Sequence, residues 1–371
     1  MFSTSFLVTY LKKYDFSFFG ISTVIFFMGV VNLYSATHGS TSEIMANLYL
    51  SQIFYYLFAL FVGVCVSFIR PKTFYRYSYL FYFFNIFLLI LVFFMGHKGM
   101  GAQRWLVLGS FRIQPSEIMK VSVILALARW FAKNCADQDM DLKKLIVPGI
   151  IAFIPTILII LEPDLGTGLL ILLIFAVICF YRRLKWKTIA IIGCLTVFSG
   201  TLMYKFGLKE YQKKRIVAFL NPTLDARGSG YNAIQSKIAI GSGRLIGKGF
   251  KKSSQASLKY LPENHTDFVF SIFNEEHGFF GSLLLLSCYI ILFFRFFWLA
   301  TSVTRIFDAI CVIGLMSLFY WHTLINMGMV MGLMPIVGLP LPLMSYGGSS
   351  LLTFGICCGV ATSISNARNL F

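Results

Sequence analysis

The stretch LIVPGIIAFIPTILIIL-EPD-LGTGLLILLIFAVICFY, residues 145–181, decides the fold class of this chain. It joins two apolar runs, 145–161 and 165–181, through a short acidic turn. Each run reaches the roughly 17 residues that a helix needs to cross a bilayer. Backbone groups in lipid must satisfy their own hydrogen bonds, which favours helices. The stretch therefore predicts two membrane-spanning helices with two carboxyl groups, Glu162 and Asp164, at their connection.

The same pattern extends along the whole chain of 371 residues. The composition is 57% hydrophobic and 17% aromatic, with only 13% charged residues, about half the usual ~25% of globular proteins. Further apolar runs lie at 16–36, 48–69, 74–95, 118–132, 187–205, 268–294, 306–330 and 346–366. An ordinary soluble domain is excluded. We expect an all-α polytopic integral membrane protein with about ten transmembrane helices, forming a single domain over residues 1–371.

The distribution of basic residues predicts the orientation. Lys and Arg gather in alternate connections, at 12–13, 70–76, 129–144 and 182–187. Short cytoplasmic loops retain such residues, so both termini should be cytoplasmic. The connection between the seventh and eighth helices, residues 206–266, should then be one long external loop. Loops of this length escape the rule, so its many basic residues need another explanation.

Four kinds of partner could account for the basic external surface and the net charge of +17. Nucleic acid is disfavoured, because the segment faces away from the cytoplasm and carries no recognisable binding motif. Anionic headgroups of membrane lipids, another protein, and a phosphate-bearing substrate stay open, since Lys and Arg suit phosphate oxygens. The glycine-rich stretch 241–249 lacks the spacing of a P-loop, and the histidines and cysteines lack the spacing of a zinc site.

Carboxyl groups cluster at the expected outer ends of the spans. Ionisable residues at such depth are functional candidates, although each could instead pair with a nearby Lys or Arg. Asp267 stands apart because it is the last polar residue before the run 268–294. Partial burial raises a carboxyl pKa, so this group could act as a base toward a hydroxyl, while cations stabilise a departing pyrophosphate. The pattern predicts transferase chemistry on a lipid-anchored substrate.

Five motifs occur in a fixed order: RW at 104–105, QPSE at 114–117, EPDLGTG at 162–168, LPENHTDF at 261–268 and PLPLMSYGGSS at 340–350. On these motifs and the ten-span layout, the chain resembles the SEDS family, the RodA/FtsW group of cell-wall polymerases. Within that group, residues 219–222, 230–232 and 235–243 are more similar to RodA.

The resemblance implies a peptidoglycan glycosyltransferase that polymerises lipid II, an undecaprenyl-pyrophosphate disaccharide-pentapeptide. The reaction would take place on the outer face of the bacterial cytoplasmic (inner) membrane, during cell elongation and rod-shape maintenance. By motif position Asp267 matches the essential acid of the family, proposed to activate the acceptor hydroxyl. The substrate-binding candidates are Arg104, Trp105, Glu117, Lys120, Lys237 and His265. We assign Arg104 and Lys120 to phosphate, Glu117 to orienting Lys120, and Trp105 to sugar or lipid.

The resemblance also implies a partner, a class B penicillin-binding protein acting as transpeptidase, which would dock at the eighth and ninth spans and at the external loop. No cofactor is required, although a divalent cation held by Asp267 and another acid is compatible with the sequence. Two alternatives stay open. A lipid II flippase should carry polar groups through the full depth of the bundle, and a non-catalytic membrane scaffold for a transpeptidase should not need Asp267.

Overall fold

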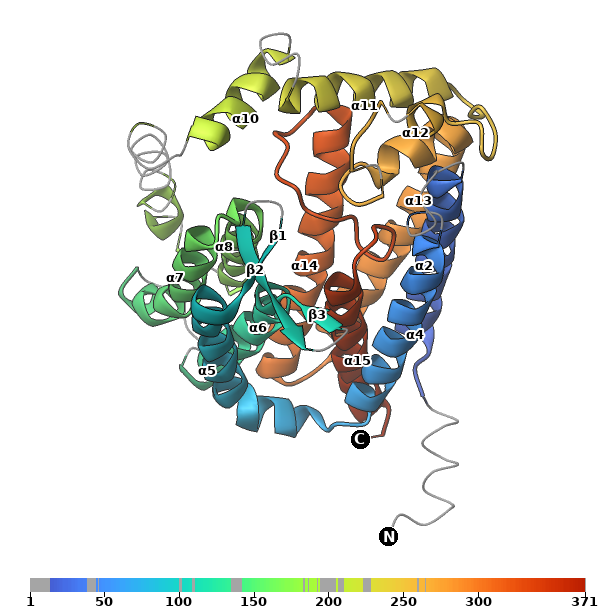
Figure 1. The fold of residues 1–371 in the computed structure, drawn as a ribbon. Helices are drawn as coiled ribbons and strands as arrows, with labels where there is room; N and C mark the ends of the chain where they lie inside the picture. The colour runs from blue at the N-terminus through green and yellow to red at the C-terminus, as the bar shows by residue number, and fades with distance from the viewer. Residues whose placement is uncertain are drawn as a thin grey trace.

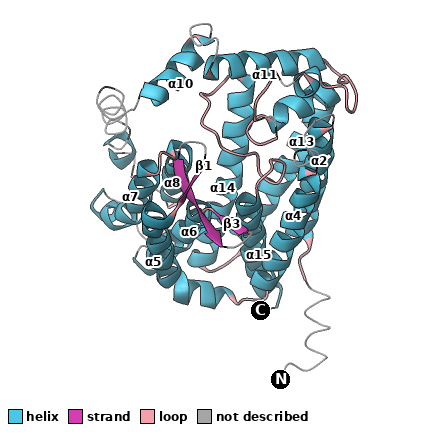
Figure 2. Cartoon of the chain, viewed as in Figure 1, coloured by secondary structure: helices cyan, strands magenta, loops and turns pink. Residues whose placement is uncertain are grey.

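The computed structural model describes residues 14–38, 45, 47–99, 102–108, 111–134, 142–182, 184–185, 187–191, 193, 205, 210–222, 228–258, 260–263 and 265–370. A bundle of helices forms most of this part of the chain (Figures 1 and 2). The long helices are α2 (Ser17–Thr37), α4 (Leu48–Ser67), α5 (Pro71–Met95), α6 (Pro115–Asn134), α7 (Ile146–Leu161), α8 (Leu165–Tyr181), α13 (Val269–Ser302), α14 (Ile306–Met331) and α15 (Gly348–Leu370). The expected helical membrane fold is confirmed.

These helices match nine of the ten apolar runs in the sequence. Within the described residues, seven helical segments are long and apolar enough to cross a membrane, and α8 is a shorter apolar helix. The helix α6 is 20 residues long but almost wholly buried among its neighbours, as a helix inside a bundle should be. The run 187–205 lies mostly outside the described residues, so the expected number of ten spans stays a prediction.

The helix α14 forms the centre of the bundle. It packs against α6, α8, α11 and α13, and its apolar side chains are buried around most of its circumference. His322, Thr323 and Asn326 on this helix are at most 3% exposed. Polar side chains on α14 therefore contact other protein groups rather than lipid.

Small residues bring α4 and α15 unusually close together. A Cβ atom at Gly359 would lie 2.3 Å from the carbonyl oxygen of Gly63, and one at Gly63 would lie 2.5 Å from that of Gly355. Close approach of backbones at small residues is a common way for helices to associate in membranes, where lipid provides little hydrophobic driving force. Larger residues at these positions would separate the two helices.

A small antiparallel sheet follows α5 and departs from the all-α expectation. Its strands are β1 (His97–Gly99), β2 (Ala102–Leu108) and β3 (Phe111–Ile113), in the order β1-β2-β3. Leu106 pairs with Ile113, and the aromatic and β-branched residues of β2 favour a strand. The sheet contacts α5, α6 and α15, and it carries Arg104 and Trp105 toward the bundle.

The segment 206–266, expected to be external and called the external segment below, contains α10 (Glu210–Leu220), α11 (Ser229–Gly243) and α12 (Ser254–Ser257). Figure 1 shows α11 lying across one end of α14, called the outer end below. At the opposite end the backbone N–H of Asp15 donates to Asn366 Oδ1 at 2.9 Å. The two ends of the described chain therefore meet on one side of the bundle. Which side faces the cytoplasm stays a prediction, as do the single-domain organisation and the external loop at 206–266.

Candidate active site

Asp267 lies at the outer end, two residues before α13 begins. Its carbonyl oxygen accepts a hydrogen bond from Asn326 Nδ2 at 2.9 Å, which ties this segment to α14. The side chain is half-buried, and burial raises the pKa of the Asp267 carboxyl to about 6. The negative charge of Glu263 raises this pKa further, whereas Arg215 opposes the rise. The result is a carboxylate at neutral pH that is more basic than an exposed one.

The segment 332–347, between α14 and α15, forms the wall beside this carboxyl group. A Cβ atom at Gly338 would lie 3.3 Å from Asp267 Oδ2, and Gly338 has a φ of +78°. Only glycine adopts such a backbone conformation without strain. The glycine therefore lets the wall approach Asp267 closely.

Two cations contact the same segment. Arg215, on α10, donates through Nη1 to the carbonyl oxygens of Ile336 at 3.3 Å and Val337 at 3.5 Å. Lys237, on α11, lies against Gly332, where an added Cβ would come within 1.9 Å of Lys237 Cε. Both line a pocket of about 290 Å³ of empty space, part of it open to solvent. Its remaining walls are Ala218, Phe219, Pro222, Ala233, Met329, Gly332, Met334 and Ile336.

Asp164 belongs to the same electrostatic neighbourhood, because its charge also raises the pKa of Asp267. It caps the first turn of α8, where Asp164 Oδ1 accepts from the Thr167 backbone N–H at 3.2 Å. Such caps satisfy donors that a helix start leaves unpaired. Gln114 Nε2 also donates to Asp164 Oδ2 at 3.3 Å. Two of the sequence motifs thus meet here.

Arg104 connects the sheet to the α7–α8 turn. Its Nε donates to the carbonyl oxygen of Glu162 at 3.0 Å, and Nη2 donates to that of Pro163. Its Nη1 lies 4.0 Å from Asp164 Oδ2. Much of this guanidinium therefore binds the α7–α8 turn. A contact between Arg104 and phosphate stays a prediction.

The Glu162 side chain has no such contact with Arg104. It is 2% exposed, and neither carboxyl oxygen has a hydrogen-bond partner among the residues that the structure describes. Burial raises the pKa of Glu162 to about 8, with a further contribution from Asp164 and an opposing one from Arg104. Glu162 is therefore largely neutral at pH 7, which avoids the cost of burying an unpaired charge.

Glu117 and Lys120 form a buried ion pair on α6. Lys120 Nζ lies 2.7 Å from Glu117 Oε1, and both side chains are almost completely buried. Lys120 Nζ also lies 2.9 Å from Nε2 of His322 on α14. The expected pairing of Glu117 with Lys120 is present in the geometry. The amine is enclosed by protein, so a direct contact with phosphate stays an untested prediction.

The two remaining candidates, Trp105 and His265, are half-buried. Trp105 follows Arg104 on β2. His265 accepts at its carbonyl oxygen from the Tyr346 backbone N–H at 2.9 Å, and its ring centroid lies 6.2 Å from that of Tyr346. Burial lowers the pKa of His265, although Glu263 opposes this effect. A neutral imidazole beside Asp267 is therefore expected at neutral pH.

Several residues that shape the site do not stand out in the motifs of the sequence. Arg215 was only one of many basic residues in the external segment, and no local motif distinguished it. His322 and Asn326 lie in the middle of an apolar run. A polar residue at that depth is itself a signal of function, and this signal could have identified both.

The arrangement offers no preformed metal centre in the part of the chain that the structure describes. No group of three or more His, Cys, Asp or Glu side chains there lies close enough to hold an ion. A divalent cation at Asp267 would therefore take at most two such ligands from these residues.

Among the described residues, seven helical segments are long and apolar enough to cross a membrane, and a polar site lies at one end of the bundle, which indicates a multi-pass membrane protein. A family model described as "Cell cycle protein", for FtsW, RodA and SpoVE, matches residues 16–370. The chain belongs to this family, and it is a multi-pass protein of the bacterial inner membrane.

Individual relatives agree with this assignment. The chain is 39% identical over 311 residues to the peptidoglycan glycosyltransferase MrdB of Escherichia coli K12, covering 84% of each protein. It is 31% identical over 414 residues to the peptidoglycan glycosyltransferase RodA of Treponema pallidum, covering 92% of this chain and 95% of that protein.

Solved structures show the same fold. A chain from a peptidoglycan synthase complex, described as coordinating polymerization and crosslinking, superposes with a TM-score of 0.80 at 28% identity, covering 96% of this chain and 98% of that one. The rod shape determining protein RodA of Thermus thermophilus gives a TM-score of 0.72 at 27% identity, covering 96% of this chain and 97% of that one.

Proposed function

We propose that this protein is a peptidoglycan glycosyltransferase that polymerises lipid II on the outer face of the inner membrane during cell elongation. The relatives named as peptidoglycan glycosyltransferases support the reaction class. The single observation that carries the mechanism is the placement of Asp267. It is a half-buried carboxyl group with a pKa of about 6, at the outer end of the bundle and under the influence of Arg215.

In the proposed step, the Asp267 carboxylate accepts the proton of the acceptor sugar hydroxyl. The hydroxyl oxygen then bonds to the anomeric carbon of the donor sugar. The bond between that carbon and the pyrophosphate oxygen breaks, and undecaprenyl pyrophosphate leaves with the electron pair. A base with a pKa near 6 is ionised at neutral pH and still accepts a proton effectively, which is the balance that general base catalysis needs.

The pocket lined by Arg215 and Lys237 suits the leaving group, and Arg215 also acts electrostatically on Asp267. Arg215 and Lys237 provide two positive charges, and most of the other lining side chains are apolar. Positive groups fixed near a departing pyrophosphate stabilise the negative charge that develops on it. We assign Arg215 and Lys237 to this role. Trp105 and His265 are the candidates for contacts with sugar, and Arg104 holds the turn that carries Asp164.

We further propose a class B penicillin-binding protein as partner. The similarity to a chain of a synthase complex that coordinates polymerization and crosslinking supports this choice. Aromatic side chains along the second half of α13 are exposed and could receive a membrane helix of the partner: Phe294, Phe297 and Trp298. Surrounding lipid would suit the same side chains, so cross-linking from Phe297 to the partner is the distinguishing measurement.

The central test is polymerisation of lipid II by the purified protein with its partner. Asp267→Asn keeps the size of the side chain but removes the base, so the rate should fall by at least ~100-fold. Asp308→Asn is a matched control, because Asp308 is also buried but lies in the first turn of α14, near the opposite end. It should leave the rate unchanged. A folded Asp267→Asn variant that polymerises normally would exclude Asp267 as the base.

Transport in vesicles addresses the flippase alternative. The proposed enzyme should consume externally supplied lipid II without moving it across the membrane. Transfer of labelled lipid II at a rate unaffected by Asp267→Asn would favour the flippase instead. For the scaffold alternative, normal growth of cells carrying an Asp267→Asn variant that assembles with its partner would decide in its favour.

A further inference from the structure

Two polar side chains of the central helix hold the wall of the site. His322 and Asn326 lie one turn apart on α14, and both are fully buried. His322 Nδ1 lies 3.1 Å from the carbonyl oxygen of Pro340, and Asn326 Nδ2 donates to that of Leu339 at 2.7 Å. Asn326 also donates to the carbonyl oxygen of Asp267. One face of α14 thus holds the segment 332–347 next to the backbone of Asp267.

The ring of His322 is held from its other side by the buried ion pair. A carbonyl oxygen only accepts, so the contact with Pro340 requires a proton on Nδ1. The ammonium group of Lys120 only donates, so Nε2 must be the acceptor. The two contacts demand the same neutral tautomer of His322. Glu117, 2.7 Å from Lys120 Nζ, keeps the ammonium in the position that enforces this choice.

Other contacts transmit the position of this wall to Asp267. Ser345 Oγ accepts from the Leu341 backbone N–H at 2.8 Å and donates to the carbonyl oxygen of Thr266 at 2.6 Å. Gly338 lies against the Asp267 carboxyl group. The wall therefore contacts the backbone next to Asp267 through Ser345, and it contacts the Asp267 carboxyl group through Gly338. A shift at Pro340 would move the carboxyl group relative to a bound hydroxyl.

We propose that His322 is a positioning residue of the transferase reaction, which transmits the fixed geometry of the Glu117–Lys120 pair through Pro340 to the Asp267 carboxyl group. This inference rests on the proposed function. Lys120 then acts through His322, not by touching the substrate. The enclosed position of its amine agrees with this role.

The chemistry of the side chain suggests a selective pair of variants. His322→Leu removes both polar contacts but keeps an apolar side chain in an apolar environment. His322→Gln can accept from Lys120 through its carbonyl oxygen and donate to Pro340 through its amide nitrogen. A purely space-filling role would tolerate Leu at least as well as Gln. A positioning role requires the reverse order.

The first measurement is the rate of lipid II polymerisation by the full-length protein with its partner. His322→Leu should lower kcat by about tenfold to a hundredfold, because small misplacements of a reacting group have effects of this size. The KM for lipid II should stay within about twofold, since no ground-state contact is lost. His322→Gln should restore most of kcat. Lys120→Met should show the same loss of kcat, whereas a raised KM would indicate direct binding of phosphate and overturn the role given to Lys120.

The second measurement does not depend on activity. Hydrogen exchange of the backbone amides in 338–345 should be about tenfold faster in His322→Leu, because the segment loses a fastening to α14. It should be unchanged in His322→Gln and in Asp267→Asn. Unchanged exchange and kcat in His322→Leu would overturn the inference, as would a folded His322→Gln variant as defective as His322→Leu. If His322→Leu fails to fold, the inference is tested with the other two variants. It requires a lower kcat in Lys120→Met and a nearly normal kcat in His322→Gln, and equal kcat values in the two would overturn it.

The two measurements also separate this inference from the proposed function. If exchange in 338–345 changes in the variants as expected but the wild-type protein does not polymerise lipid II, the proposed function is overturned. The structural role of His322 in holding the segment 332–347 would then still stand. A wild-type protein that polymerises, with neither kcat nor exchange sensitive to His322→Leu, would overturn the inference alone.

Discussion

Burial, together with charges of opposite sign around Asp267, sets the basicity of the proposed base. Burial and the carboxyl groups of Glu263 and Asp164 raise the pKa of Asp267, and Arg215 lowers it. Each neighbour comes from a different element, so no single segment controls the carboxyl group. The balance places the pKa at about 6, so the carboxyl group is mostly ionised at neutral pH.

The acid limb of the pH–rate profile should therefore respond to single neighbours in opposite directions. Polymerisation should rise with pH around pH 6, as Asp267 loses its proton and becomes a base. Arg215→Met removes a charge that lowers the pKa, so this limb should move to higher pH. Glu263→Gln removes a charge that raises it, so the limb should move to lower pH. The measurement is kcat/KM against pH, and two shifts in the same direction would contradict the assignment.

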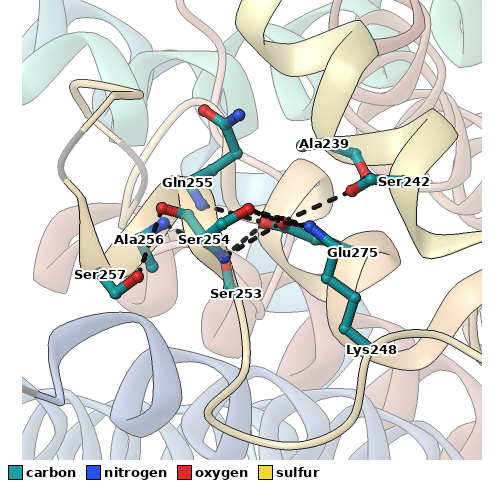
Figure 3. A network of polar contacts seen from close by, with 9 residues as sticks. All are labelled: Ala239, Ser242, Lys248, Ser253, Ser254, Gln255, Ala256, Ser257 and Glu275. Atoms are coloured by element: carbon teal, nitrogen blue, oxygen red, sulfur yellow. Dashed lines mark hydrogen bonds and ion pairs between the residues drawn. The ribbon is translucent and has the colours of Figure 1, made fainter.

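Among the elements, α13 changes direction where the external segment attaches to it. Gly278 interrupts the helix with a φ of +65° and a ψ of −160°. Just before it, the fully buried Glu275 accepts from Lys248 Nζ, Ser253 Oγ and the backbone N–H of Ser254 (Figure 3). A carboxylate with several charge-assisted hydrogen bonds is a strong anchor. This network fastens the stretch 244–258 to α13.

Loss of that anchor should loosen the external segment. Glu275→Gln removes the charge that pairs with Lys248, and a hydrogen bond to a charged group contributes about 1.5–3 kcal/mol. We expect a lower thermal stability and faster cleavage by trypsin within 244–258. Lys252→Arg is the control, because it keeps the trypsin site and because Lys252 is exposed and is not among the described residues that donate to the Glu275 carboxylate. Equal cleavage rates in both variants would show that Glu275 does not hold the segment.

The interruption of α13 is a separate prediction at the same scale. A Cβ atom at Gly278 would lie 2.3 Å from the backbone nitrogen of Gly247, and its positive φ disfavours any side chain. Gly278→Ala should therefore destabilise the protein by at least about 1–3 kcal/mol, seen as a lower midpoint of thermal unfolding in detergent. Gly241→Ala is the matched control, since no atom lies within 4 Å of its added Cβ. A variant at Gly278 as stable as this control would refute the close approach.

For the whole molecule, the two ends of the bundle differ in chemistry and should face different compartments. The outer end carries Asp267 and the basic external segment. At the opposite end, Arg295 pairs with Asp15, close to the contact between Asp15 and Asn366. A substrate carried on a membrane lipid reaches the site from the outer leaflet only if the outer end faces away from the cytoplasm.

Labelling of introduced cysteines tests this orientation. Lys252→Cys places a thiol on an exposed position of the outer end, and Arg305→Cys places one on the exposed connection between α13 and α14. An impermeant maleimide should label the first in intact cells and the second only after permeabilisation. The background should carry Cys65→Ser, because Cys65 is itself exposed. The reverse pattern would invert the predicted topology.

Much of this helical architecture can be predicted from local sequence. Apolar runs predict helices wherever they are long enough, because a backbone in lipid must form its own hydrogen bonds. Nine of these runs became helices among the described residues. Local sequence also made Asp267 a candidate for the base, because a carboxyl group at the edge of an apolar run is unusual whatever its neighbours in the fold are.

The partners of each site residue could not be read from local patterns, because packing joins residues far apart in the chain. Lys120 and His322 are separated by 202 positions, and Arg104 and Pro163 by 59. The sequence predicts a role for Lys120 at phosphate, which stays untested, but it does not predict that the amine is enclosed between α6 and α14. Composition and apolar runs therefore determined a membrane-embedded helical protein, and the motifs indicated a transferase with Asp267 as the proposed base. Helix packing alone decided which charges surround that base and which side chains hold it in place.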